Sequence, residues 1–152
     1  MSYTNADGLL VLTDGAAGIP ADNGLTAVGA KKTMLVNIDL TKGDQALNTA
    51  TDAAIPAGSY ITAASLVVKT AAAGGTSVTI GLITAAGADI DADGIDAAVA
   101  TADLAANKAV ACDGALVGGT ATVGAADGYV DIDVTGTFTA GELALVIEYI
   151  EV

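Results

Sequence analysis

The chain has 152 residues, enough for one domain with a sizeable core, and 53% of them are hydrophobic although only 3% are aromatic. Eighteen acidic residues against five lysines give a formal net charge of −13, and the sequence contains neither histidine nor arginine. A chain this acidic repels phosphate backbones and anionic membrane surfaces, so we expect neither nucleic acid nor a membrane as its partner.

The same composition removes much of the usual chemistry of protein sites. Without histidine, no imidazole can shuttle protons near neutral pH or bind a transition metal. Cys112 is the only cysteine, so an intrachain disulfide is impossible and a zinc site is excluded. A thiol nucleophile needs a neighbouring base, and therefore we interpret Cys112 as a small buried hydrophobic residue.

The first part of the chain, residues 1–32, reads as an irregular N-terminal arm. Residues 9–12, "LLVL", predict a short strand, and Gly, Pro, Asp and Asn recur through the rest. From residue 33 the pattern becomes regular, so we expect a single domain over residues 33–152.

Alternating hydrophobic residues predict the first strands of this domain. In "TMLVNIDL", Met34, Val36 and Ile38 share one face, as expected for a half-buried strand. Further strands are predicted at 59–70 and 76–84, and the intervening "AAAGGT" resembles a hairpin connection between them.

The alternation stops after Gly94, where "IDAAVATADLAANK" is rich in alanine. Ile95, Val99 and Leu104 recur at roughly helical spacing, and Asp96 is a suitable N-cap because its carboxylate can accept the free N–H groups of a first turn. We therefore predict one short helix near residues 96–106.

The last third returns to strands. Val130, Ile132 and Val134 alternate with aspartates, and "ELALVIEYIEV" is apolar on both faces, which predicts a central or interface strand. Several short strands with a loop about every ten residues favour a mainly β fold, an antiparallel β-sandwich of jelly-roll-like type.

One acidic stretch has the spacing of a calcium-binding loop. Asp89, Asp91, Asp93 and Gly94 match the first half of an EF-hand, but Ala100 stands where the bidentate glutamate is required. We interpret the stretch as a solvated turn, and Asp89, Asp91 and Asp93 remain candidates for a looser calcium site.

Asp131 and Asp133 form a second acidic pair. Paired carboxylates can hydrolyse glycosidic bonds, but no aromatic platform for a sugar accompanies them. Because both lie on the polar face of a strand, we interpret them as solvent-facing side chains.

Phrases along nearly the whole chain resemble a known group of proteins. "MSYTNADGLLVLT", "IPAGSYITAASLVV", "DIDADGIDAAVA", "VACDGALVGG" and "FTAGELALVIEY" are similar to head decoration, or capsid cement, proteins of tailed bacteriophages, especially of marine and cyanophage type. The resemblance implies a structural protein that is not an enzyme, needs no cofactor and has no catalytic residues.

The resemblance also implies a place and partners for the protein. It would lie on the outer capsid surface of a virion, bind the major capsid protein, bridge its subunits and form a homo-oligomer, most often a trimer.

Two rival interpretations remain open at the level of the sequence. One is an adhesin-like or carbohydrate-binding β-sandwich on a virion or cell surface, with or without calcium. The other is an enzyme that uses only carboxylates, which requires aspartates from separate strands to meet in a pocket.

Overall fold

The computed structural model describes residues 2–4, 10–12 and 31–152. Contacts divide the chain into two units, Met1–Lys32 and Thr33–Val152. In the first unit, β1 (Ser2–Thr4) pairs antiparallel with β2 (Leu10–Leu12), which falls where the sequence predicts a short strand. Of the irregular arm predicted over residues 1–32, residues 5–9 and 13–30 lie outside the described residues, and Lys31 and Lys32 already belong to a strand.

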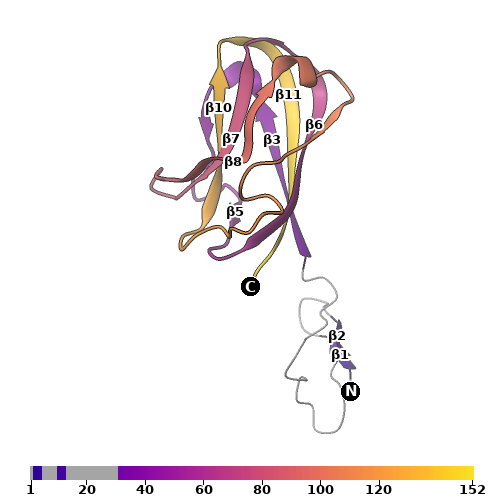
Figure 1. The fold of residues 1–152 in the computed structure, drawn as a ribbon, viewed down its shortest axis with the longest axis vertical. Helices are drawn as coiled ribbons and strands as arrows, with labels where there is room; N and C mark the ends of the chain where they lie inside the picture. Colours follow the sequence, from indigo (N-terminus) through magenta and orange to yellow (C-terminus); the bar gives the residue numbers. More distant parts are fainter. Residues whose placement is uncertain (1, 5–9, 13–30) are drawn as a thin grey trace. The chain divides into compact units, whose positions relative to one another are not determined.

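The second unit is a sandwich of two sheets (Figure 1). The strands of the first, sheet I, in spatial order are β3 (Lys31–Asp39), β11 (Phe138–Ile150), β6 (Tyr60–Gly74) and β9 (Ala109–Ala111). The strands of the other, sheet II, are β4 (Gln45–Ala46), β10 (Gly128–Thr135), β7 (Ser77–Ile83) and β8 (Asp89–Ala100), and β5 (Ala54–Ile55) also pairs with β10.

The order of the strands is that of a jelly roll. Between residues 31 and 152, each successive strand lies in the opposite sheet, except that β4 and β5 both pair with β10 and β7 and β8 form a hairpin. This alternation is a double Greek key, and neighbours such as β11 and β6 run antiparallel. The predicted antiparallel β-sandwich is therefore confirmed.

The connection "AAAGGT" was predicted incorrectly as a hairpin. Most of it extends β6 as far as Gly74, and the chain then crosses from sheet I to sheet II before β7 begins. Here Gly75 N donates to Thr137 O at 2.8 Å and Thr76 N donates to Thr135 O at 2.7 Å. These hydrogen bonds join the corner to the connection from β10 to β11, which runs beside it in the opposite direction, and no ladder forms between β6 and β7.

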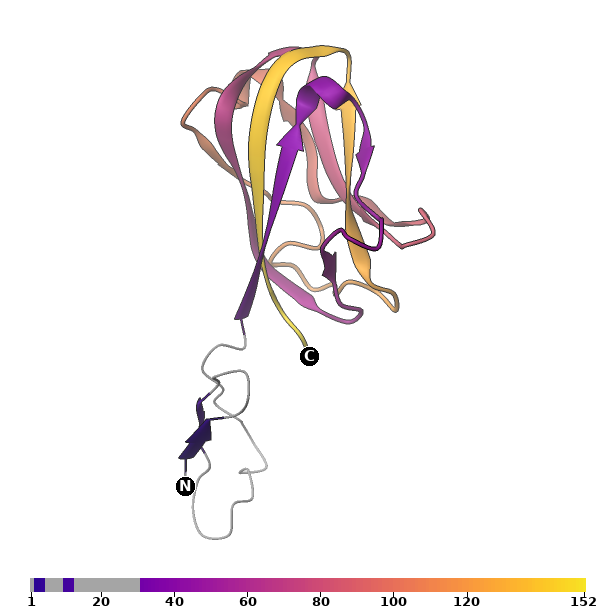
Figure 2. The ribbon, with the colours of Figure 1, turned by 180° about the vertical axis from the view of Figure 1, so that it is seen from behind.

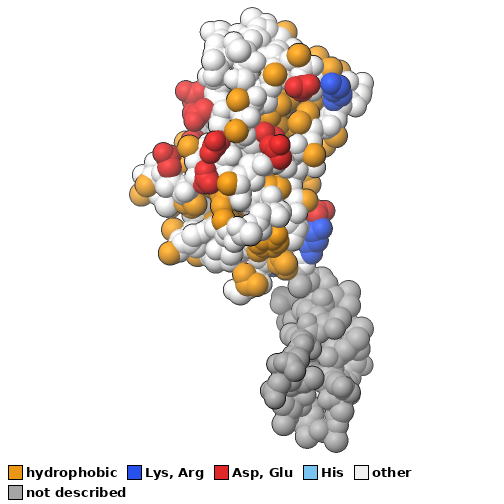
Figure 3. Space-filling model, in the orientation of Figure 1, with side chains coloured by type: hydrophobic (Ala, Val, Ile, Leu, Met, Phe, Trp, Pro, Cys, Tyr) orange, Lys and Arg blue, Asp and Glu red, His pale blue; other side chains and the backbone are white. Residues whose placement is uncertain are grey.

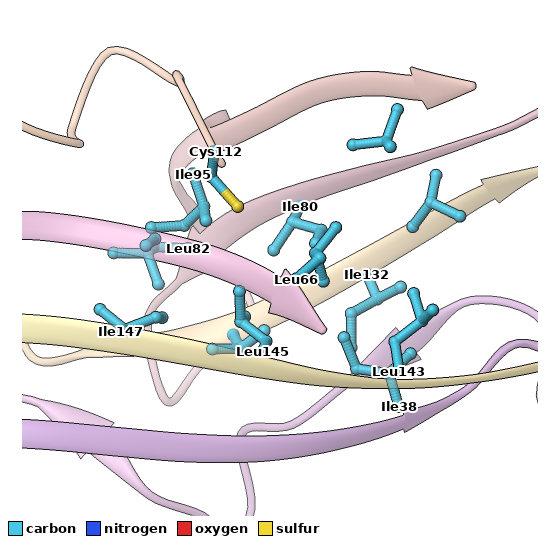
Figure 4. Close-up of a cluster of buried hydrophobic side chains, with 14 of the residues drawn as sticks. Ile38, Leu66, Ile80, Leu82, Ile95, Cys112, Ile132, Leu143, Leu145 and Ile147 are labelled. Atoms are coloured by element: carbon cyan, nitrogen blue, oxygen red, sulfur yellow. The ribbon is translucent and has the colours of Figure 1, made fainter. Parts of the chain in front are cut away.

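Alternate residues of the strands fill the space between the sheets (Figure 4). Leu143, Leu145 and Ile147 of β11 are fully buried, as are Ile80 and Ile132 on the opposite sheet. Strand β11 lies between β3 and β6, so the prediction that this strand is central is confirmed. Figure 2 shows β3, β11 and β6 side by side.

The helix predicted near residues 96–106 is wrong. Residues up to Ala100 belong to β8, and only the three residues Thr101–Asp103 form a 3-10 turn, η2. The other such turn is η1, Leu40–Lys42. In the described part of the chain, no helix has the length and apolar character needed to cross a membrane.

Bulges in β8 explain the error. Strand β8 has 12 residues opposite the 7 residues of β7, and the register between them shifts repeatedly. Val78 and Ile80 of β7 are two positions apart, whereas their partners Val99 and Asp96 are three positions apart, and Ala98 takes a positive φ of 56°. Bulges break the period of two, so the sequence pattern imitates a helix although Ile95 and Val99 are core residues of a strand.

Candidate interaction surfaces

The three candidate calcium ligands separate into two groups on β8. Asp91 lies beside Asp93, whose backbone N–H donates a hydrogen bond to Asp91 Oδ1 at 3.4 Å. The pKa of Asp91 is raised mainly by burial and, to a smaller extent, by the side chain of Asp93. Asp89 instead lies near Asp131 of β10, whose pKa it helps to raise. Among the described residues, no group of three or more acidic, cysteine or histidine side chains is arranged to hold a metal ion.

An acidic surface covers the outer side of sheet II. Asp131 and Asp133 project from β10, and the pKa of Asp131 is raised by partial burial and then by Asp133, Asp89 and Asp44. Asp44 also accepts a hydrogen bond from the backbone N–H of Val134 at 2.9 Å. These carboxylates lie on an open sheet face, and the hollows described below contain neither Asp131 nor Asp133.

Cys112 and Asp96 form a buried polar pair. Asp96 lies within β8, so the predicted N-cap role is wrong; it is only 5% exposed, and its carboxylate accepts a hydrogen bond from the Cys112 thiol. Burial is the main cause that raises the pKa of Cys112 to about 12, and Asp96 adds to it. The thiol is therefore protonated at neutral pH, and Cys112 is a buried core residue as predicted (Figure 4).

The same region brings together two of the phrases that carry the phage resemblance, "DIDADGIDAAVA" and "VACDGALVGG". Leu116 N donates to Gly94 O, and Gly114 N donates to Ile95 O, both at 2.9 Å. A Cβ atom on Gly94 would meet the Leu116 side chain at 2.6 Å. The glycine of the half EF-hand is therefore needed for close packing between two segments rather than for binding a metal.

The charges of the two sheets differ. Among the described residues, the strands of sheet II carry six aspartates and no lysine, whereas those of sheet I carry three lysines and three carboxylates. In Figure 3, acidic side chains gather over the area of β7 and β8, and the lysines in view lie along the right-hand margin. Sheet II is therefore the acidic side of the sandwich, and sheet I is close to neutral.

The outer face of sheet I also exposes apolar side chains, which the sequence analysis indicated for β11 but missed for β3 and β6. Leu35 of β3 is 59% exposed and Val67 of β6 is 40% exposed, and Val146 of β11 is partly exposed. The signal in the sequence was a hydrophobic residue at a position where alternation calls for a polar one, because Leu35 stands between Met34, a core residue, and Val36, which is partly buried against the core.

Two surface hollows lie on either side of β3. One, of about 360 Å³, is lined by polar side chains that include Lys42, Lys69 and Glu142. The other, of about 390 Å³, lies between β3 and the segment after β4, and Leu35 and Leu47 line it. Both hollows open to solvent, and Asp39, Lys42, Lys69 and Glu142 are the titratable residues that line the first.

Comparison with solved structures identifies two chains with the same fold. One belongs to the structure of the cyanophage Pam1 capsid asymmetric unit, with a TM-score of 0.56 and 19% identity over 91% of this chain and 96% of that chain. The other belongs to the capsid of Ralstonia phage GP4, with a TM-score of 0.55 and 16% identity over 82% of this chain and 86% of that chain.

These likenesses extend over nearly the whole length of the compared chains, so the shared unit is the complete fold rather than a single motif. No protein-family model and no curated protein matches the sequence. The resemblance to phage capsid-associated proteins predicted from the sequence is thus confirmed at the level of the fold.

Proposed function

We propose that this protein is a structural component of a phage virion that decorates the outer capsid surface. In this proposal it has no enzymatic role. It stabilises the capsid because each copy bridges neighbouring subunits of the major capsid protein and so resists the outward pressure of packaged DNA.

The observation that carries the proposal is the shared fold. The jelly roll of this chain matches chains from two phage capsid structures over more than four fifths of each chain. A fold alone permits many functions. The resemblance of turn and strand phrases in the sequence points independently to the same class of protein, and that agreement favours a role in the virion.

The composition is compatible with this role. An acidic sheet II keeps a protein soluble at the high copy number that a capsid lattice requires. Repeated attachment to a symmetric lattice allows weak single contacts to give firm binding, especially if the protein acts as a homo-oligomer, for which the sequence resemblance favours a trimer.

Binding to phage heads tests the proposal directly. Purified protein is mixed with mature heads of its own phage from which the decoration protein has been removed, and the heads are then sedimented. We expect saturable binding at a fixed number of copies per head, together with a higher temperature at which the heads release their DNA. Protein that stays in the supernatant at every concentration would contradict the proposal.

Two further measurements show what the binding to heads depends on. Unexpanded precursor heads show whether binding needs the mature lattice, and a parallel series with calcium or with chelator tests the calcium-assisted alternative. A stabilisation of the free protein by calcium, seen as a melting temperature that rises with calcium concentration, would favour that alternative.

A further inference from the structure

One edge of sheet I is a long strand with a free side. In the described part of the chain, β3 pairs only with β11, and Figure 2 shows it at the margin of the sheet. The N–H and C=O groups on the free side of an edge strand can pair with another chain, unless lysine, proline or a bulge prevents it. The lysines of β3 lie at its first two positions, and residues 33–38 contain no charge, proline or glycine. The free side of β3 therefore lacks the usual protection.

The other edges of the two sheets are short or covered. Strand β9 has three residues, and β4 and β5 have two each. Strand β8 is bulged and carries four aspartates. The loop after β9 also donates hydrogen bonds to it, from Leu116 N to Gly94 O and from Gly114 N to Ile95 O. Among the described strands, β3 is therefore the edge to which a further strand can add.

Alternation along β3 shows which of its backbone groups are free. Asp39 O accepts a hydrogen bond from Gln45 Nε2 of β4 at 3.0 Å, so this carbonyl is directed away from β11. Successive residues of a strand direct their N–H and C=O groups to opposite sides, and every second residue directs them to the same side. Leu35 and Asn37 therefore direct their N–H and C=O groups to the free edge, as Asp39 does.

The hollow of about 390 Å³ lies along this free edge. It is lined on one side by Leu35, Val36 and Asn37 of β3, and on the other side by residues that include Leu47 and Val130. Side chains of an added strand alternate between the two faces of the sheet, so every second one is directed inward, over the hollow. Val130 is a core residue and Leu47 packs against the core, so the hollow suits an apolar side chain.

The charge at the rim of the hollow favours a basic segment. Asp52 is the charged residue among the described residues that line it. Its carboxylate accepts hydrogen bonds from Thr49 N at 2.8 Å and from Thr49 Oγ1 at 2.7 Å, which hold it in place. A second copy of the chain, with its net charge of −13, would bring more negative charge to this edge. A segment with a lysine or arginine beside its apolar residue is complementary to it.

We propose that β3 binds an extended segment of a capsid subunit, which adds to sheet I as a further strand. The segment places an apolar side chain in the hollow and a lysine or arginine beside Asp52. Hydrogen bonds between the main chains supply affinity, and the hollow fixes which residues of the segment pair with Leu35 and Asn37. This inference rests on the proposed function, because it names the element through which the chain contacts the capsid.

Hydrogen exchange on phage heads tests the backbone pairing. Heads of its own phage, from which the decoration protein has been removed, are saturated with the full chain. They are then incubated in deuterated water, quenched and digested. We expect the amides of Leu35 and Asn37 to exchange at least about tenfold more slowly on heads than in the free protein, because they become hydrogen-bonded. Residues 109–111 of β9 should change by less than about twofold.

A matched pair of proline variants tests the same edge. Leu35→Pro removes an N–H group from the free edge of β3, and Ala111→Pro removes one from the free edge of β9. Cys112 N donates to Ala64 O of β6, so by alternation the N–H of Ala111 faces away from β6. Proline is tolerated at such positions of edge strands. We expect Leu35→Pro to weaken binding to heads at least about tenfold, and Ala111→Pro to leave it within about twofold.

Variants of the hollow keep the test decisive if Leu35→Pro lowers the melting temperature. Ala53→Trp fills the hollow from an exposed position at its wall, and Ala106→Trp adds the same side chain at an exposed position of a loop outside the hollow. The same tenfold and twofold effects, each approximate, are expected. Asp52→Asn removes the charge at the rim and should weaken binding about threefold at low salt.

The outcomes separate this inference from the proposed function. An unmodified chain that does not bind heads overturns both. Heads that bind the unmodified chain, Leu35→Pro and Ala53→Trp equally well overturn this inference alone, and so does unchanged exchange at Leu35 and Asn37. If Leu35→Pro reduces self-association in sedimentation equilibrium but leaves binding to heads intact, the free edge of β3 pairs with a second copy, and the inference is wrong.

Discussion

The backbones of Gly94 and Gly114 pass so close together that a Cβ atom on Gly114 would lie 2.4 Å from the Gly94 carbonyl oxygen. The two residues belong to separate segments, β8 and the loop after β9, which the hydrogen bond from Leu116 N to Gly94 O holds together. Gly94 and Gly114 are each two residues along the chain from a member of the buried pair Asp96 and Cys112.

Gly114→Ala should therefore destabilise the protein through overlap of atoms. We expect a loss of about 1 to 3 kcal/mol in the free energy of unfolding, the range for added atoms in tightly packed sites. Gly87→Ala is the control, because space around Gly87 is open and only its φ of +78° opposes a side chain. That variant should lose about 1 kcal/mol. Urea unfolding compares the two, and equal losses would mean that crowding at Gly114 is unimportant.

Ala98→Gly distinguishes the bulged strand from the helix that the sequence pattern suggests. Ala98 is exposed and has a φ of 56°, a conformation that glycine adopts without strain. We expect the substitution to raise the free energy of unfolding by about 0.5 to 1 kcal/mol.

Ala97→Gly is the matched control, at an exposed neighbour without a positive φ, and it should lower the same free energy by about 0.5 to 1 kcal/mol. In a helix, both substitutions would be destabilising by a similar amount. A loss of stability in Ala98→Gly, measured by urea unfolding, would therefore contradict the strand assignment.

Stability should increase as the pH is lowered from neutral into the mildly acidic range. Burial raises the pKa values of Asp96 and Asp131 above 3.8, and nearby carboxylates raise them further. The folded state then binds protons more tightly than the unfolded state, so these groups stabilise the fold below the unfolded pKa and this contribution is lost as pH rises through the folded pKa.

Two other carboxylates, Asp39 and Asp52, make the protein less stable at low pH and so limit the pH range over which stability increases. Hydrogen bonds from Thr41 and Thr49 lower the pKa values of Asp39 and Asp52, so their contribution is present above 3.8 and is lost as pH falls below it. Melting temperatures should therefore peak at a pH just above this value. Asp131→Asn should reduce the increase in melting temperature that occurs as the pH is lowered from neutral. A melting temperature that increases steadily toward pH 8 would contradict the raised pKa values of Asp96 and Asp131.

Cys112 should be unreactive in the folded protein. Its side chain is buried and its pKa is raised to about 12, so neither access nor the thiolate form is available to an alkylating reagent. We expect labelling by iodoacetamide at pH 8 to proceed only in urea. A Thr135→Cys variant, with one added thiol at an exposed position, should gain one label without urea. Rapid labelling of the native chain at Cys112 would show that this end of the core opens.

Much of the fold could be predicted from local patterns. Where a strand is regular, as at Val130 and Ile132 or at Leu143 and Leu145, every second side chain faces the core, and the sequence shows this directly. The same regularity showed β11 to be a central strand, since its second face is also largely apolar. Composition alone excluded an intrachain disulfide and histidine chemistry.

The rest depended on contacts between distant segments. One bulge of β8 lies opposite Gly81, between the partners of Ile80 and Leu82, and there a Cβ on residue 81 would lie 2.4 Å from the Ala92 carbonyl oxygen, so the bulge needs glycine at this position. No local propensity reports such a contact, and the alanine-rich sequence favours a helix when considered alone.

Sequence by itself therefore determined the class of fold, the identity of most core residues and the absence of common catalytic groups, because these follow from periodicity and composition. Tertiary structure decided which sheet each strand joins, and it separated six aspartates on sheet II from the lysines of sheet I. It also brought Gly94 to Gly114 and placed Leu35 on the same sheet face as Val67, because only the crossing of the chain between the two sheets brings residues so far apart in sequence together.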